Sequence, residues 1–146
     1  MSTEDTISRK LREVREELKR YTAEEAAAAM ERGALLIDLR PVEYRLRNGE
    51  VPGAITVSRH MLEWRLDVTS DRRLKELAHG DAEREIVLFC NEGYTSSLAA
   101  YQVMRDIGLT NVTDIVGGFD AWRDADLPVQ PRTLTVGSPK ESPPAG

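Results

Sequence analysis

The sequence predicts an α/β fold in which a mostly parallel sheet is covered by helices on both faces. Short apolar runs typical of buried strands, such as residues 34–37 and 86–89, alternate with segments of helical periodicity. This alternation favours a parallel sheet, because consecutive parallel strands need a long connection that is usually a helix. We therefore expect a three-layer α/β/α arrangement, with one further amphipathic helix at the N-terminus.

Length and composition fit one domain with short tails. The chain has 146 residues, of which 40% are hydrophobic and 31% charged, and its net charge is −5. No apolar run approaches the roughly 20 residues that cross a bilayer, and the acidic, polar N-terminus is unlike a secretory signal. The net charge argues against a nucleic-acid partner, although a local basic patch would be compatible with it. We expect no membrane association.

The cysteine content bears on compartment and cofactors. The single cysteine, Cys90, can form no internal disulfide. With only two histidines in the chain, a structural zinc site is not expected either. We therefore expect a reducing cytoplasm, no metal and no cofactor.

The pattern divides the chain into an N-terminal amphipathic helix at residues 1–20, a domain at residues 21–130 and a disordered tail at residues 131–146. The helix is expected from one apolar stripe on an otherwise charged segment, formed by Ile7, Leu11, Val14 and Leu18. Two interpretations are open: the helix packs on its own domain, or it binds a partner, which includes a homodimer. The tail is rich in proline, glycine and serine and has no periodicity.

A second helix is expected to start at Thr22 and to continue through the alanine-rich run at residues 24–32. Thr22 and Glu25 have the spacing of a capping box, and Gly33 suits the position just after a helix. The elements expected next are a strand at 34–37, a short helix at 42–46, a strand at 54–57, and helices at 60–66 and 71–78. After the central strand at 86–89 we expect a helix at 98–107, a strand at 112–116 and a short helix at 119–123.

The stretch from residue 86 to residue 97 indicates a reactive site. Its buried strand delivers Cys90 to a loop of small and polar residues, with a helix starting just behind. Amide groups of such a loop and a helix N-terminus both favour a thiolate, which is the reactive form. Asp38 and Arg40 follow another strand. If the two strands are neighbours, the three side chains share the edge where parallel strands place their sites.

Three motifs together resemble the rhodanese-like domain family over roughly residues 21–129. They are LIDLRPVEYRLRNGEVPGAI at 36–55, CNEGYTS at 90–96 and GGFDAW at 117–122. Each is weak alone, but their order, spacing and predicted elements agree with the family. Two departures stand out: Glu50 occupies a position where the family commonly has histidine, and Glu92 one where well-known thiosulfate sulfurtransferases carry a cation.

The resemblance implies a sulfurtransferase in which Cys90 becomes a persulfide. A donor such as thiosulfate would supply the sulfane sulfur, and cyanide, a thiol or a carrier protein would accept it. The active-site loop would comprise Asn91, Glu92, Gly93, Tyr94, Thr95 and Ser96. Arg40 is the candidate cation for substrate binding and Asp38 the candidate to orient it, with a structural ion pair as the alternative for both. Glu92 lies within about 10 Å of the sulfur and is expected to weaken the use of thiosulfate.

Two other functions compete with sulfur transfer. The related phosphatases need a longer loop and an arginine that clamps phosphate, and the sequence has no arginine between Cys90 and Arg105. A phosphatase is therefore not expected. A non-catalytic binding or regulatory module, or a sulfur relay that works only with a protein partner, stays open.

Overall fold

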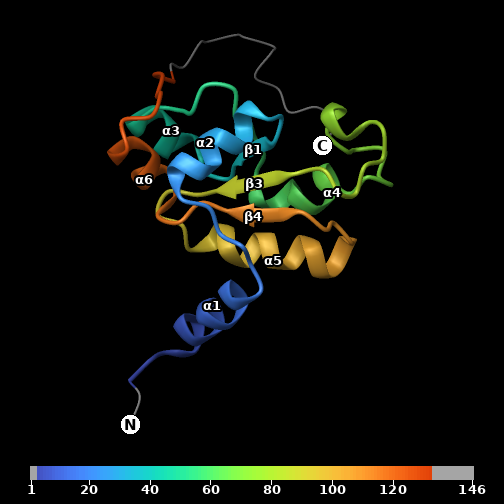
Figure 1. The fold of residues 1–146 in the computed structure, drawn as a ribbon, viewed down its shortest axis with the longest axis horizontal. Helices are drawn as coiled ribbons and strands as arrows, with labels where there is room; N and C mark the ends of the chain where they lie inside the picture. Colours follow the sequence, from blue (N-terminus) through green and yellow to red (C-terminus); the bar gives the residue numbers. More distant parts are fainter. Residues whose placement is uncertain (1–2, 133–146) are drawn as a thin grey trace.

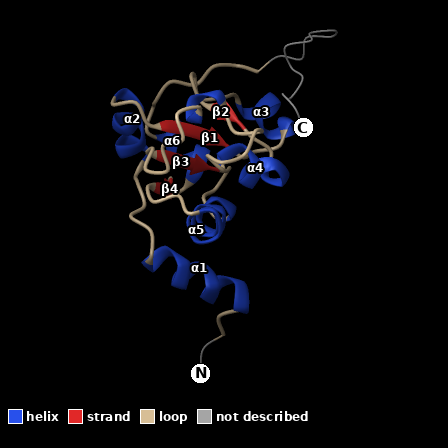
Figure 2. Ribbon diagram, turned by 90° about the vertical axis from the view of Figure 1, so that its right-hand side faces the viewer, coloured by secondary structure: helices blue, strands red, loops and turns tan. Residues whose placement is uncertain are grey.

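The computed structural model describes residues 3–132 and confirms the predicted α/β class. Within these residues, four parallel strands form one sheet that has helices on both faces (Figures 1 and 2). In their order across the sheet, the strands are β2 (Ile55–Thr56), β1 (Leu35–Asp38), β3 (Ile86–Phe89) and β4 (Val112–Asp114). The helices are α1 (Thr6–Glu16), α2 (Ala23–Glu31), α3 (Val42–Asn48), α4 (Leu62–Leu66), α5 (Thr95–Ile107) and α6 (Gly118–Asp124), with 3-10 turns at Arg59–Met61 and Lys75–Leu77.

Alternate side chains of the strands enter two hydrophobic cores, one on each face of the sheet. Leu35 and Ile37 of β1 pack with α4 and α5, whereas Leu36 packs with α2 and α6. This alternation follows from the period of two in a strand. Because β1 and β3 are covered on both faces, β3 and the first three residues of β1 are apolar, and Asp38 at the end of β1 is buried.

Helix α2 begins where its capping box predicts. The Thr22 hydroxyl accepts a hydrogen bond from the Glu25 N–H at 3.1 Å, and the Glu25 carboxylate accepts one from the Thr22 N–H at 2.8 Å. Ala23, Ala26 and Ala29 form the buried face of the helix. Their small side chains let the helix lie close to the sheet.

Two predicted helices differ from the structure at their ends. The N-terminal helix stops at Glu16 rather than at residue 20, and the following segment runs beside β4, where Tyr21 forms a bridge with Ile115. Helix α5 begins at Thr95, three residues earlier than predicted. Polar residues 95–97 match a loop by pattern alone, but two of them are buried in the first turn of the helix.

The helix predicted at residues 71–78 is wrong, because only the 3-10 turn Lys75–Leu77 forms there. Just before it, the Asp67 carboxylate accepts the Thr69 N–H, and the Ser70 hydroxyl accepts the Arg72 N–H. Such short-range bonds from side chain to backbone hold a chain in turns and compete with helix formation. The other predicted elements agree with the structure within two residues at each end.

The two ends of the described chain pack against different parts of the domain. Helix α1 lies against α5 at one edge, whereas Gln130 pairs with Glu50 in an antiparallel bridge near α3 (Figure 1). From residue 133 onward, the predicted disordered tail lies outside the described residues. The predicted domain boundaries stay predictions.

None of the helices in residues 3–132 combines the length and apolar character that crossing a membrane requires.

Candidate active site

The cysteine follows β3 at the edge of the sheet where the parallel strands end. Cys90 is half-buried and begins a loop that leads directly into α5. Strands β1 and β3 are neighbours, and Asp38 lies opposite Phe89 in the register. The prediction that the two strand ends share one edge is therefore confirmed.

Polar groups of the loop contact the Cys90 sulfur. The backbone N–H of Gly93 donates to Sγ at 3.2 Å, and Sγ lies 3.5 Å from the hydroxyl oxygen of Ser96. A backbone N–H aimed at sulfur stabilises negative charge that develops there. The arrangement therefore suits chemistry in which the sulfur is anionic.

The turn at Gly117 and Gly118 brings α6 against the cysteine loop. A Cβ atom on Gly118 would lie 2.5 Å from the Cys90 carbonyl oxygen, and one on Gly93 would lie 2.9 Å from the Gly117 nitrogen. Gly93 also has a φ of 89°, a conformation that favours glycine. Across this close contact, the Phe119 N–H of α6 donates to the Cys90 carbonyl at 2.9 Å. The glycine motif thus holds the loop in place.

A cavity of about 360 Å³ opens beside Cys90. The loop residues that line it are Asn91, Glu92, Tyr94 and Thr95, and those on the β1 side are Leu39, Arg40, Pro41 and Tyr44. Glu92 is exposed and is among the residues that line the cavity. Within residues 3–132, no group of three or more histidine, cysteine and acidic side chains is placed to hold a metal ion.

Arg40 and Asp38 form a buried ion pair. They are 3% and 1% exposed, and Arg40 Nη2 lies 2.9 Å from Asp38 Oδ2. The same Nη2 donates to the Gly49 carbonyl at 2.8 Å, and the guanidinium lies 3.9 Å from the centre of the Phe119 ring. This geometry corresponds to the structural alternative for both residues. Substrate binding by Arg40 or Asp38 stays a prediction.

Sequence reasoning missed Asp114, which organises the first turn of α5. Asp114 is fully buried at the end of β4, and its Oδ2 accepts the hydroxyls of Ser96 and Ser97, each at 2.8 Å. Arg20 donates to both carboxylate oxygens, at 2.8 and 3.0 Å. A chain of polar contacts thus leads from Arg20 through Asp114 and Ser96 to the Cys90 sulfur. The one signal in the sequence was a charged residue inside a mostly apolar strand, where burial is unusual.

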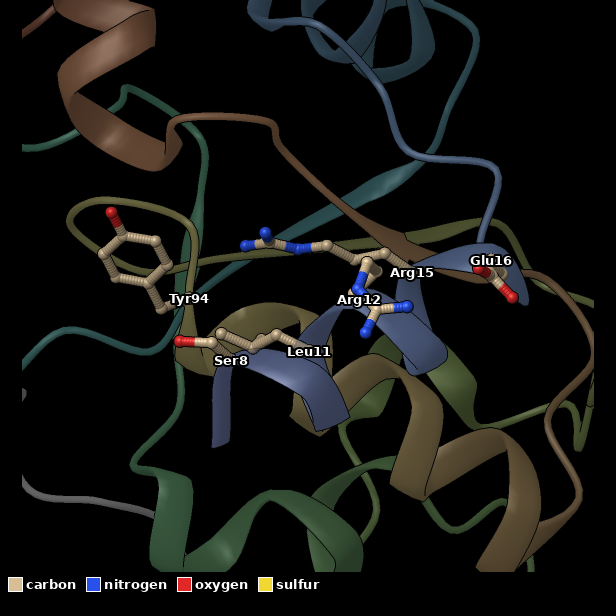
Figure 3. A pocket seen from close by; sticks show the side chains of 6 residues that line it. All are labelled: Ser8, Leu11, Arg12, Arg15, Glu16 and Tyr94. Carbon is tan, nitrogen blue, oxygen red and sulfur yellow. The ribbon is translucent and has the colours of Figure 1, made fainter. Parts of the chain in front are cut away.

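Sequence reasoning also missed Arg15 and Arg20, because charged residues of an amphipathic helix are usually exposed. Both guanidinium groups donate to the carbonyl oxygen of Gly93, at 2.7 Å from Arg15 and 3.1 Å from Arg20. Figure 3 shows the Arg15 side chain extending from α1 toward the loop that carries Tyr94. Burial lowers the pKa of Arg15, the positive charge of Arg20 lowers it further, and the Asp114 carboxylate acts in the opposite direction.

Several known proteins resemble this chain over most of its length. The rhodanese-like domain family matches residues 22–125. A thiosulfate sulfurtransferase (GlpE) of Pseudomonas savastanoi pv. phaseolicola is 30% identical over 108 residues, which cover 73% of this chain and 89% of that protein. A solved structure from Rhodopseudomonas palustris, of a protein of unknown function described as a possible tyrosine phosphatase, is 31% identical. Its TM-score is 0.73, and the match covers 89% of this chain and 99% of the other.

The fold is shared more widely. The polysulfide-sulfur transferase homodimer of Wolinella succinogenes is 22% identical with a TM-score of 0.66, and the match covers 88% of this chain and 89% of that one. Its similarity supports the arrangement of strands and helices described above. The chain therefore belongs to the rhodanese-like domain family and is a sulfurtransferase of the rhodanese type.

Proposed function

We propose that the protein moves a sulfane sulfur from a donor such as thiosulfate to a nucleophilic acceptor through a persulfide on Cys90. One observation carries this proposal: the half-buried Cys90 sulfur lies beside a cavity of about 360 Å³ and accepts the Gly93 N–H. The sulfurtransferase relatives support the same class of reaction.

The reaction consists of two displacements at sulfur. First, the Cys90 thiolate attacks the outer sulfur of thiosulfate, an S–S bond forms, and the S–S bond of the donor breaks as its electron pair leaves with sulfite. Second, an acceptor such as cyanide attacks the terminal sulfur, departs as thiocyanate and regenerates the thiolate. Both steps need an anionic sulfur nucleophile or leaving group. The Gly93 N–H donates to this sulfur and stabilises its charge.

Charges beside the cavity bear on the choice of donor. Glu92 lines the cavity and repels a dianion such as thiosulfate, because it lies within a Debye length of the sulfur. The charge of Arg40 is already balanced by Asp38. We therefore propose that thiosulfate is a weak donor and that a less negatively charged sulfane sulfur compound is used better. A thiol or a carrier protein can serve as acceptor through the same loop.

Mass spectrometry of the intact protein tests the persulfide. After incubation with thiosulfate or another sulfane-sulfur donor, the wild-type protein should gain the mass of one sulfur atom, and cyanide should remove it. Cys90→Ser is the control and should gain nothing. If the wild-type protein gains no sulfur from any donor, the chain is instead a binding module or a relay that needs its protein partner.

The Rhodopseudomonas palustris relative is described as a possible tyrosine phosphatase, so phosphatase activity is the alternative to consider. The cysteine loop holds no arginine, and both arginines that reach it, Arg15 and Arg20, donate to the Gly93 carbonyl. Arg40 lines the cavity but is paired with Asp38 and the Gly49 carbonyl, so a phosphate there would lack the bidentate clamp that phosphatases use. We expect no hydrolysis of p-nitrophenyl phosphate by the protein under conditions in which it transfers sulfur.

The oligomeric state and the cellular location of the protein are further proposals. In α1, Val14 is buried and Leu18 just beyond the helix is buried too, which supports packing on the protein's own domain. Ile7 at the start of the helix is 53% exposed and is the part of the apolar stripe left for a second copy of the chain or for an acceptor protein. A cytoplasmic location stays a prediction from the single cysteine.

A further inference from the structure

Helix α1 brings side chains to the cysteine loop from outside the family match, which begins at residue 22. The helix lies against α5 (Figures 1 and 2). Val14 and Leu18 anchor this segment, since they are 2% and 8% exposed. Because α5 starts directly behind the cysteine loop, a helix docked on it can reach the loop. Arg15 of α1 does so, and so does Arg20 in the segment that follows the helix.

These two arginines hold the residue that contacts the sulfur. The N–H of Gly93 donates to Cys90 Sγ, and the carbonyl of the same residue accepts both guanidinium groups. Glycine has the greatest backbone freedom and loses the most of it on ordering. Two charge-assisted hydrogen bonds to the Gly93 carbonyl offset the free-energy cost of ordering this residue. They also limit movement of its N–H away from the sulfur.

The held carbonyl also determines the direction of the next amide. The peptide group between Gly93 and Tyr94 is planar and trans, so its N–H points opposite to its carbonyl. Since the carbonyl points to the guanidinium groups of Arg15 and Arg20, the Tyr94 N–H is directed away from them. Arg15 adds a second contact to the same turn, because its Nε donates to the Ser97 hydroxyl at 3.1 Å.

Positive charge exceeds negative charge within the hydrogen-bonded cluster of Arg15, Arg20 and Asp114. Arg15 and Arg20 contribute two positive charges, and Asp114 contributes one negative charge, so the hydrogen-bonded cluster carries one excess positive charge. The Cys90 anion is among the groups that favour the charged form of Arg15 and so oppose the lowering of its pKa by burial. The positive charge of Arg15 therefore lies close enough to Cys90 for the two groups to interact.

We propose that Arg15 and Arg20 are positioning residues for sulfur transfer at Cys90. They fix the Gly93 carbonyl and the Asp114 carboxylate, and they supply the positive charge that the loop itself lacks. This role rests on the proposed function of Cys90. It makes α1 part of the active site, although α1 lies before the matched domain.

Arg15 is the residue to change, because its hydrogen bonds go to neutral groups and its loss leaves no buried carboxylate without a partner. Arg20→Met would leave the buried Asp114 carboxylate without its positive partner, and unfolding could obscure the result. Arg15→Lys tests rescue by a side chain that keeps the charge but cannot bridge two acceptors in the same way. The matched control is Arg12→Met, one turn earlier on α1, whose partner is Glu4 at the surface.

Two rates report on the sulfur. Cys90 is the only cysteine in the chain, so alkylation by the neutral reagent iodoacetamide measures its reactivity alone. For Arg15→Met we expect the alkylation rate at pH 7 and kcat for sulfur transfer each to fall about tenfold, as expected for a lost charge-assisted hydrogen bond. KM and the midpoint of thermal unfolding should change little. Arg15→Lys should recover part of both rates, and Arg12→Met should match the wild-type protein.

The alkylation rate separates the positioning role from the proposed function. If the wild-type protein gains no sulfur but Arg15→Met still slows alkylation, the positioning role at Cys90 holds and the proposed persulfide on Cys90 is rejected. Equal alkylation rates and equal kcat in Arg15→Met and wild type would overturn the positioning role even if sulfur transfer is intact. A loss of rate that disappears after correction for the unfolded fraction would overturn it too.

Discussion

Replacing Arg20 by methionine is expected to lower the free energy of unfolding by about 3–5 kcal/mol. Arg20 bonds both oxygens of Asp114, and the two side chains are 15% and 0% exposed. Without the guanidinium, the carboxylate stays buried with the hydroxyls of Ser96 and Ser97 as its hydrogen-bond donors. Breaking one side of a buried pair has this cost because a charge remains without compensation. Methionine preserves much of the aliphatic packing, so the loss reports mainly on the charge.

Urea unfolding, followed by tryptophan fluorescence, measures this loss. Arg123→Met is the matched control, because its pair with Asp120 is exposed, at 47% and 38% for the two side chains, and should contribute less than about 1 kcal/mol. The double variant Arg20→Met with Asp114→Asn removes the unpaired carboxylate charge and should recover part of the stability. A loss below about 1 kcal/mol for Arg20→Met would refute the reasoning that Asp114 depends on Arg20.

Two further predictions concern charge. Glu92→Lys should raise kcat/KM for thiosulfate severalfold, because repulsion of the dianion becomes attraction. Glu92→Gln should give an intermediate kcat/KM. An unchanged kcat/KM would mean that the side chain does not face the donor. A hydrogen bond from Arg32 lowers the pKa of Glu85 in the folded protein. The pair therefore stabilises the fold fully at pH values above the ordinary glutamate pKa of about 4.3. This stabilisation is lost as the pH falls through the lower pKa of Glu85 in the folded protein. Urea unfolding between pH 3 and 6 should show this slope in the wild-type protein and a flatter one in Arg32→Gln; equal slopes would contradict it.

Much of the fold could be predicted because its signals are local. The capping box of Thr22 and Glu25, and the apolar run of β3, each lie within a few residues and determine one element. The predictions failed where local patterns mislead. The segment 71–78 has helical spacing, but the side chains of Asp67 and Ser70 bind nearby N–H groups and turns form before it.

The site was predictable only in part. The cysteine loop and the glycine pair carry motifs, so Cys90, Gly93 and Gly118 could be recognised from the chain alone. The state of Asp38 and Arg40 could not, since either an open edge or a buried pair agrees with the sequence. The structure shows the pair buried, with Arg40 lying over the Phe119 ring.

The sequence by itself determined the α/β class, the order of the elements and the thiol on which the proposed chemistry depends, because periodicity, caps and motifs act over short stretches of chain. Only the tertiary structure decided what surrounds that thiol. Arg20 and Asp114 are 94 positions apart, and Arg15 is 78 positions from Gly93. Their contacts depend on how α1 packs against α5, and no local pattern encodes that packing, because it follows from burial of apolar side chains across the whole fold.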